Sequence, residues 1–240
     1  MTKPKVLVVD DEPDLLDVIC IELDLRGFET FRAISGNRAI QILHEQEIDA
    51  IVSDIRMPDG SGIDILQFLL ERQNLTPIIF LSGFSDVSRE ELFGKGASGF
   101  YTKPTEMKII AAKLEKTLLP ASQRWTTPSE PTKKVTIKLA FTNYEAAKRS
   151  GSFEVGSGGF FINVEAPRFS IGETIEFEIK FGETRALLGE GTVRWLNQTD
   201  VAKTLCGIEI DYLMEGSRST FLNMIDVEQP IAFIPQSSSD

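Results

Sequence analysis

The sequence has little of what marks several protein classes: two cysteines, one histidine and no long apolar run among its 240 residues. Cys20 and Cys206 lie far apart in apolar surroundings, so we expect buried reduced thiols and a cytoplasmic location rather than a disulfide framework. The early run "KVLVV" is too short for the core of a signal peptide, and no stretch is long enough to span a membrane. His44 falls in a predicted helix away from any strand end, and we assign it no catalytic role.

Basic residues are also scarce, with 25 Lys and Arg against 36 Asp and Glu and a net charge of −11. Binding to nucleic acid or to an anionic membrane relies on clustered basic side chains, which release counterions from the polyanion. The sequence contains no basic run of that kind. We therefore expect neither nucleic-acid binding nor membrane insertion.

Two different apolar patterns divide the chain. Up to about Leu119, short β-branched runs such as "KVLVV", "AIVS" and "PIIFL" alternate with segments of helical period, which predicts a parallel sheet with helices on both faces. From residue 134 the period becomes two, as in "VTIKLAF" and "IEFEIKF", which predicts half-buried antiparallel strands. We expect these strands to form a small β-barrel or sandwich with one closing helix in "SRSTFLNMI".

The segment that separates the two patterns is rich in Pro, Ser and Thr and has no period, which is typical of a linker. We expect a first domain at residues 1–121, a linker at 122–133, a β-barrel at 134–228 and a tail at 229–240 that is loose at its tip.

In the first half, polar residues interrupt the apolar pattern where predicted strands end. These residues are Asp10, Asp11, Asp54, Ser82 and Lys103. One Asp after a strand is usually a turn or N-cap residue, but coincident polar positions at several strand ends favour a site, because such ends converge in an open parallel sheet. Clustered carboxylates suit a hard cation such as Mg²⁺, and a lysine beside them suits an anion. Together they predict phosphoryl transfer to Asp54.

Four stretches, "VLVVDDEPD", "IVSDIRMPDGSGIDIL", "IIFLSG" and "GFYTKP", resemble in order and spacing the motifs of the receiver domain of bacterial two-component response regulators. The resemblance implies a flavodoxin-like, doubly wound α/β fold with a five-stranded parallel sheet, Mg²⁺ as cofactor, and a sensor histidine kinase or phosphotransfer protein as partner. By position it implies these roles: phosphoacceptor Asp54; metal ligands Asp11, Asp54 and the Arg56 carbonyl, with Asp10 acting through water; phosphoryl contacts from Ser82 and Lys103; and aromatic switch residue Phe100.

The second half resembles a PilZ domain, a small six-stranded β-barrel, through "GSGGFFIN", "RFSIGETIEFEI", "GEGTVRW" and "CGIEIDYL". PilZ domains that bind cyclic di-GMP use an Arg-x-x-x-Arg element and an Asp/Asn-x-Ser-x-x-Gly turn. Here "EVGSGG" puts Glu154, Gly156 and Gly159 at the turn positions. Before the barrel, Arg124 has no arginine partner four residues away, and Lys133 and Lys134 lack the planar fork of arginine. We therefore interpret the glycines as a tight strand connection, with a residual nucleotide site as the alternative.

Three functions remain open from the sequence. We favour a phosphorylation-controlled regulator whose PilZ-like domain contacts an unknown protein target. The alternative is a regulator that integrates phosphorylation with cyclic di-GMP, and a barrel that binds single-stranded nucleic acid ranks last because the second half is acidic. We expect no enzyme activity beyond the phosphorylation and dephosphorylation of the chain itself.

Overall fold

The computed structural model describes residues 2–83, 87–128, 134–165, 169–198 and 203–236. It divides into two compact units. Met1–Val87 and Gly96–Leu119 form the first, which we call the α/β unit. Ser88–Lys95 and Pro120–Asp240 form the second, which we call the β unit. No helix among the described residues is both long and apolar enough to cross a membrane.

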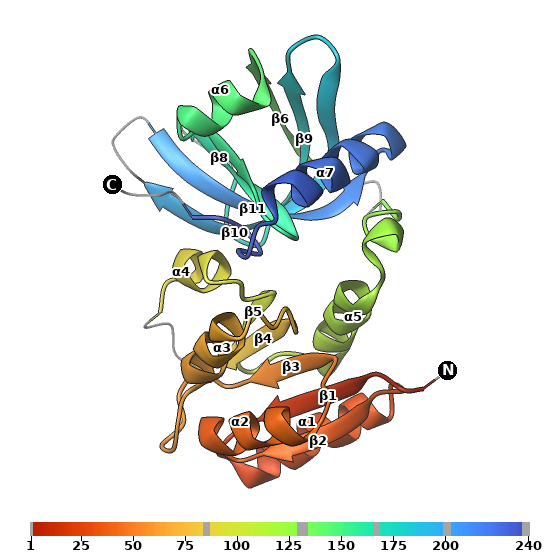
Figure 1. The fold of residues 1–240 in the computed structure, drawn as a ribbon, viewed down its shortest axis with the longest axis vertical. Coiled ribbons are helices and arrows are strands. Elements are labelled where there is room, and N and C mark those ends of the chain that lie inside the picture. Colours follow the sequence, from red (N-terminus) through yellow and green to blue (C-terminus); the bar gives the residue numbers. More distant parts are fainter. Residues whose placement is uncertain (1, 84–86, 129–133, 166–168, 199–202, 237–240) are drawn as a thin grey trace. The chain divides into compact units, whose positions relative to one another are not determined.

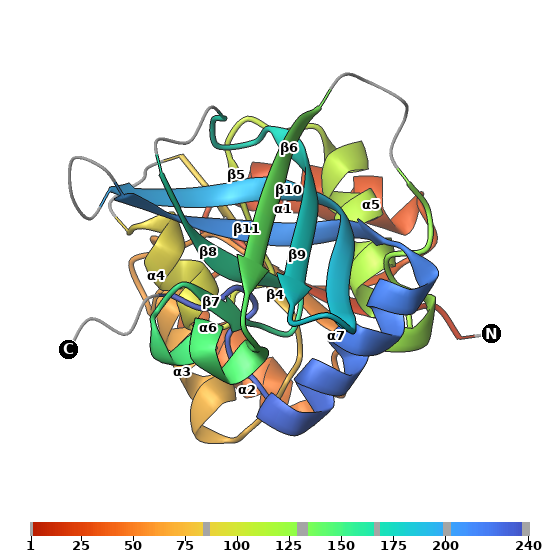
Figure 2. The ribbon, with the colours of Figure 1, turned by 90° about the horizontal axis from the view of Figure 1, so that it is seen from above.

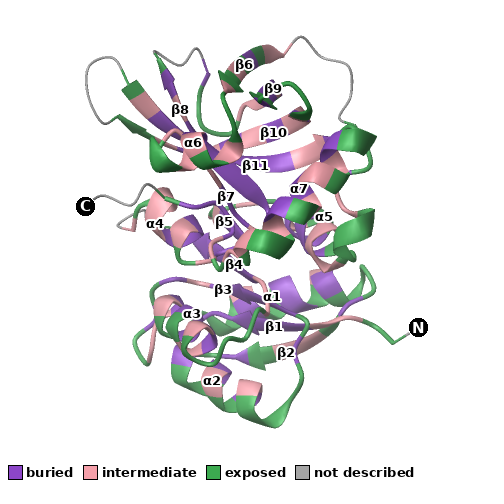
Figure 3. Ribbon diagram, turned by 45° about the horizontal axis from the view of Figure 1, so that its top comes forward, coloured by how far each residue is buried: buried purple, intermediate pink, exposed green. Residues whose placement is uncertain are grey.

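The α/β unit contains a five-stranded sheet in which every pair is parallel, in the order β2-β1-β3-β4-β5 (Figure 1). Its strands are β1 (Lys5–Val9), β2 (Glu29–Ala33), β3 (Ala50–Ser53), β4 (Ile78–Ser82) and β5 (Gly99–Thr102). The central strands β1, β3 and β4 are almost wholly buried (Figure 3), as expected where helices cover both faces of a parallel sheet. The predicted five-stranded parallel α/β sheet is confirmed.

Serine side chains cap two of the helices of the α/β unit. The helices are α1 (Pro13–Asp24), α2 (Gly36–Glu45), α3 (Gly62–Glu71) and α5 (Met107–Leu118). Ser35 caps α2 by accepting a hydrogen bond from Arg38 N, and Ser61 forms a capping box with Asp64 at α3. Apolar residues of α1 and α5 pack with alternate residues of β1 in one core cluster. The remaining residues of β1 face the opposite side of the sheet, where α2 contacts it.

The β unit contains a curled six-stranded sheet in the order β6-β9-β10-β11-β8-β7. Its elements are α4 (Arg89–Gly94), a 3₁₀ turn at Ala121–Gln123, β6 (Val135–Phe141), α6 (Tyr144–Arg149), β7 (Phe153–Val155), β8 (Gly159–Glu165), β9 (Thr174–Phe181), β10 (Arg185–Gln198), β11 (Lys203–Leu213) and α7 (Glu215–Glu228). The C-terminal helix α7 confirms the expected closing helix.

The expectation of a purely antiparallel barrel is wrong in one respect, because β6 pairs with β9 in parallel. Figure 2 shows the two strands side by side with their arrowheads pointing the same way. The long connection through α6, β7 and β8 makes this possible, since parallel neighbours need a crossover and a hairpin cannot join them. The sheet is therefore mixed, and the PilZ assignment stays a prediction.

The core of the β unit follows the period of two. Ile175, Phe177, Ile179 and Phe181 of β9 are all buried in one cluster, as their alternation predicts. Trp125, which lies in the expected linker, joins the same cluster and packs edge-on against Phe221 of α7, with ring centroids 5.2 Å apart. Its carbonyl also accepts a hydrogen bond from Leu213 N at 3.0 Å. Part of the linker stretch thus contributes to the core.

Candidate functional site

Backbone hydrogen bonds fix the ends of the parallel strands that carry the predicted site. Asp10 N donates to Ala33 O at 3.1 Å, and Asp54 N donates to Val9 O at 2.9 Å. Lys103 N donates to Ser82 O at 2.9 Å, beside the cis Lys103–Pro104 peptide bond. The strand ladder therefore continues one residue beyond each strand, so the first polar residues after β1, β3 and β5 are held at one edge of the sheet.

Lys103 joins two of the predicted acids. Its Nζ lies 2.7 Å from Asp10 Oδ2 and 2.7 Å from Asp54 Oδ2. The side chains of Asp10 and Asp54 are only 2% and 13% exposed, so both pairs are shielded from water. Burial lowers the pKa of Lys103, but its hydrogen bonds and charge interactions with Asp10 and Asp54 outweigh burial and leave that pKa above the ordinary value. Lys103 is therefore a firmly charged ammonium inside the site.

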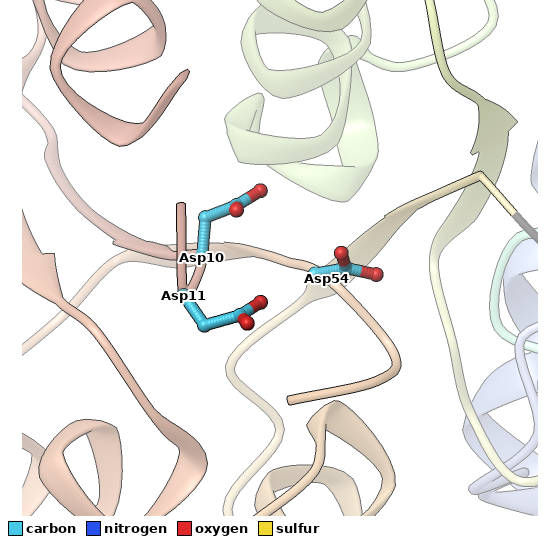
Figure 4. A group of neighbouring side chains, drawn as sticks. All are labelled: Asp10, Asp11 and Asp54. Carbon is cyan, nitrogen blue, oxygen red and sulfur yellow. The ribbon is translucent and has the colours of Figure 1, made fainter. Parts of the chain in front are cut away.

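The three aspartates form the cluster that the sequence predicts. One oxygen from each of Asp10, Asp11 and Asp54 lies within 4.8 Å of the others (Figure 4). Two ligands of one octahedral Mg²⁺ ion, each at about 2.1 Å, can be at most about 4.2 Å apart, so small side-chain adjustments bring these oxygens into range. Three carboxylates beside one ammonium leave an excess of negative charge. The cluster thus fits a divalent cation in both donor chemistry and size.

Asp54 is held by its own loop. Its Oδ1 accepts hydrogen bonds from Ile55 N at 2.5 Å and from Arg56 N at 3.4 Å, while Oδ2 contacts Lys103. A Cβ on Gly62 would lie 2.3 Å from Asp54 O, so glycine lets α3 begin directly against the Asp54 backbone. An open cavity of about 430 Å³ adjoins the cluster. It is lined by Asp11, Arg56, Met57, Pro58 and Ser61.

The other predicted receiver residues lie within or just after neighbouring strands. Ser82 is the last residue of β4 and is buried, and Phe100 is a buried residue of β5. Arg56 lies two residues after Asp54, and its N–H donates to Asp54 Oδ1 at 3.4 Å. The structure joins Lys103 to Asp54 by an ion pair, and the roles of Ser82 and of the Arg56 carbonyl stay predictions.

The residual nucleotide site predicted in the second half is not assembled in the same way. Lys133 lies outside the described residues, and Lys134 Nζ pairs with Glu190 Oε1 of β10 at 2.7 Å with its side chain nearly buried. Gly156 N donates to Gly159 O at 2.7 Å, which closes the turn between β7 and β8. The tight-connection interpretation of these glycines agrees with this geometry.

Glu154, the acidic residue before that turn, is half-buried on β7. Burial is the largest influence and raises its pKa, Lys148 lowers it, and Glu228 raises it again. Lys148 is already paired with Glu228 of α7. Glu154 therefore belongs to a charged cluster between β7, α6 and α7, where its carboxylate is partly desolvated.

Sequence reasoning missed the residues that contact the glycine turn. Ala232 and Phe233, in the predicted loose tail, accept hydrogen bonds from Ser157 N and Gly158 N at 2.9 and 3.0 Å. Phe233, Ile234 and Pro235 are buried. The apolar run "IAFIP" after the closing helix was the available signal, since an exposed tail has no need of consecutive apolar residues.

Comparison with known proteins bears on the α/β half of the sequence. Residues 6–115 match the family described as "Response regulator receiver domain". Response regulator protein PilR of Pseudomonas aeruginosa is 32% identical over 108 residues, 45% of this chain and 24% of that protein. Transcriptional regulatory protein KdpE of Mycobacterium tuberculosis is 39% identical over 111 residues, 45% of this chain and 48% of that protein. The chain thus spans less than half the length of these curated relatives.

Solved structures with similar sequences cover the same half. The receiver domain of Francisella response regulator 1452 is 28% identical, covers 48% of this chain and 97% of that chain, and has a TM-score of 0.46. Response regulator protein TrrA of Thermotoga maritima, solved in complex with Mg²⁺-BeF, is 26% identical, covers 48% and 99%, and has a TM-score of 0.44. On the strength of the family match and of the strand-end site described above, residues 6–115 are a response regulator receiver domain.

Proposed function

We propose that this chain is a response regulator in which Asp54 accepts a phosphoryl group and the β unit carries the output. The observation that supports this most strongly is the single cluster of Asp10, Asp11, Asp54 and Lys103 at the edge of the parallel sheet. The phosphoryl donor is a sensor histidine kinase or a phosphotransfer protein.

The residues of the cluster divide the chemistry between them. A carboxylate oxygen of Asp54 attacks phosphorus and forms a P–O bond, while the bond from phosphorus to the donor breaks and the donor leaves with that electron pair. Lys103, which pairs with Asp54, would pair with the transferred phosphoryl oxygens, and Ser82 would donate a hydrogen bond to them. Asp10, Asp11, Asp54 and the Arg56 carbonyl would hold Mg²⁺, which supplies charge neutralisation between the carboxylates and the incoming phosphoryl group.

The modification is transient, because water can attack the phosphorus of the acyl phosphate, break its bond to the Asp54 oxygen, and release inorganic phosphate with the Asp54 carboxylate regenerated. We propose no further enzymatic reaction. Cys206 is buried and burial raises its pKa, so it stays a protonated thiol with no nucleophilic role.

For the output, we propose that the β unit is a PilZ-like domain that acts by contacting a protein target. Cyclic di-GMP is the alternative ligand, but several groups at its predicted site already have partners within the chain. Lys134 is committed to Glu190, and the N–H groups of Ser157 and Gly158 are occupied by Ala232 and Phe233. Calorimetric titration of the full chain with cyclic di-GMP tests this, and micromolar binding would favour the alternative, a regulator that integrates cyclic di-GMP with phosphorylation.

The phosphoacceptor assignment has a direct test. Asp54→Asn should abolish modification by acetyl phosphate, because an amide is not a competent nucleophile and the substitution also weakens the metal site. Phosphorylation is read from the band shift on a phosphate-affinity gel. Asp59→Asn, in the same loop but outside the cluster, is the matched control and should be modified like the wild type. Equal modification of the Asp54→Asn variant would refute the proposal.

A further inference from the structure

The turn between β7 and β8 presents two backbone donors that the hairpin itself does not use. Gly156 N bonds back to Gly159 O at 2.7 Å and so closes the turn. The next two N–H groups, those of Ser157 and Gly158, donate out of the hairpin. Adjacent backbone N–H groups of this kind form a concavity suited to an anion or a carbonyl oxygen. We call Gly156, Ser157 and Gly158 the glycine cradle.

A segment more than seventy residues further along the chain occupies these donors. Ser157 N donates to Ala232 O at 2.9 Å, and Gly158 N donates to Phe233 O at 3.0 Å. Ser157 Oγ lies 3.4 Å from Ala232 O and adds a third, longer contact. Two consecutive donors of the cradle thus bond to two consecutive carbonyls of the tail.

The glycines of the cradle are matched to this segment. A Cβ on Gly156 would lie 2.4 Å from Phe233 O and 2.8 Å from Ala232 O. A Cβ on Gly158 would lie 1.9 to 2.6 Å from three atoms of the Phe233 ring. Any side chain larger than hydrogen would therefore displace the tail backbone at Gly156 and the Phe233 ring at Gly158.

The exit of α7 directs the tail to this place. Gln229 follows the helix in the left-handed conformation, with φ of 46°, and Pro230 prevents the helix from continuing. A left-handed non-glycine residue is held at some conformational cost. Beyond it, Phe233 and Ile234 are buried, at 8% and 0% exposed, whereas Ile231 is 65% exposed.

The tail also contacts α4 within the same β unit. Phe233 N donates to Phe93 O at 3.2 Å, and the two rings stack with centroids 6.2 Å apart. Gln236 lies against Gly94, where an added Cβ would come within 2.9 Å of its side chain. Phe233 therefore touches the glycine cradle on one side and α4 on the other.

We propose that residues 231–236 are an intramolecular peptide ligand of the glycine cradle, with Phe233 as its anchor, and that they must leave before the cradle can bind anything else. The segment has no helix or strand of its own, and it is held by a few hydrogen bonds and one aromatic anchor. Segments without regular structure and with few hydrogen bonds open at lower free energy than the core they cover. Its release frees both the two cradle donors and the end of α4. The proposal does not depend on phosphorylation of Asp54.

Residue-resolved amide hydrogen exchange on the full chain tests it. Phe233→Ala should speed exchange of the Ser157 and Gly158 amides by at least about tenfold, a change of about 1.4 kcal/mol. The Gly156 amide should stay protected, because its bond to Gly159 O lies within the hairpin. Ile231→Ala, at the exposed neighbouring position, is the matched control and should change none of the three.

Gly158→Ala disrupts the same contact between Gly158 and Phe233 by changing the cradle instead of the tail. It should accelerate exchange at Ser157 as Phe233→Ala does, and combining the two changes should add little, since either one already breaks the shared contact. Two results would overturn the proposal. One is unchanged Ser157 and Gly158 protection in the Phe233→Ala variant. The other is loss of Gly156 protection together with them, which would make the tail a structural part of the hairpin and not a ligand of it.

Discussion

Removing the Asp11 carboxylate tests the electrostatics of the acidic cluster. One oxygen from each of Asp10, Asp11 and Asp54 lies within 4.8 Å of the others, and Lys103 pairs with Asp10 and Asp54. One ammonium thus offsets one of those two carboxylates. Without a bound metal ion, Asp10, Asp54 and Lys103 together carry a net charge of about −1 at roughly 5 Å from the Asp11 carboxylate. Repulsion from this charge destabilises the folded protein when Asp11 is ionised.

The repulsion at Asp11 determines how much its removal should stabilise the metal-free protein. Two like charges 4.8 Å apart repel by about 0.9 kcal/mol in water and about 3.5 kcal/mol at an effective dielectric constant of 20. Asp11 is exposed, so a value of about 1–2 kcal/mol applies. Its position just before α1 favours a negative charge by roughly 0.3–1 kcal/mol. Asp11→Ala should therefore stabilise the metal-free protein by roughly 0.5–1 kcal/mol and raise its Tm by a few degrees.

Thermal unfolding in EDTA and across a Mg²⁺ titration measures both parts of the prediction. Wild-type protein should gain stability as the metal binds the folded state, by about 2.7 kcal/mol at a concentration of 100 times Kd. The Asp11→Ala variant should lose most of that gain, so the order of the two Tm values reverses. Glu47→Ala, at an exposed position outside the cluster, controls for the change in net charge. A Mg²⁺ gain equal to that of wild type, or a Tm in EDTA no higher than the control, would refute the reasoning.

Two further predictions concern the β unit. The raised pKa of Glu154 means that the folded state binds the proton of this carboxyl group more tightly than the unfolded state does. The protonated group therefore contributes to the free energy of unfolding below its unfolded-state pKa, and this contribution is lost as pH rises through the folded-state pKa. Glu154→Gln should therefore raise Tm at pH 7.5 but not at pH 4, with Glu165→Gln as control; an equal shift at both pH values would contradict this. Gly207→Ala should cost about 1–3 kcal/mol in urea unfolding, because its Cβ would lie 2.0 Å from two atoms of the Trp195 ring. Gly216→Ala in α7, where a Cβ meets nothing within 4 Å, should instead stabilise by about 0.5–1 kcal/mol, and equal effects of the two changes would show that the contact is not decisive.

The sequence alone was sufficient to predict the receiver half. Strands β1, β3 and β4 are local apolar runs, whereas the sequence of β2, ETFRA, is not, and a fifth strand was implied only by the family resemblance. Parallel strands bring their carboxyl ends to one edge of a sheet, so the position of a residue after a strand predicts its neighbours. Asp10, Asp54 and Lys103 are 44 and 49 residues apart along the chain, yet this rule places them together, and the structure joins them by ion pairs. The period of two likewise predicted which side chains of β9 are buried.

Only the tertiary structure decided how the strands of the second half pair and what covers the glycine turn. An alternating strand looks the same in the sequence whether its neighbour is parallel or antiparallel, so the β6–β9 pairing depends on the path of the chain between them. A glycine-rich turn shows that space is needed but not what fills it. The space beside Gly156 and Gly158 is filled by Ala232 and Phe233, and Trp125 of the expected linker packs in the core. Long-range packing, and not the local sequence pattern, selects these contacts.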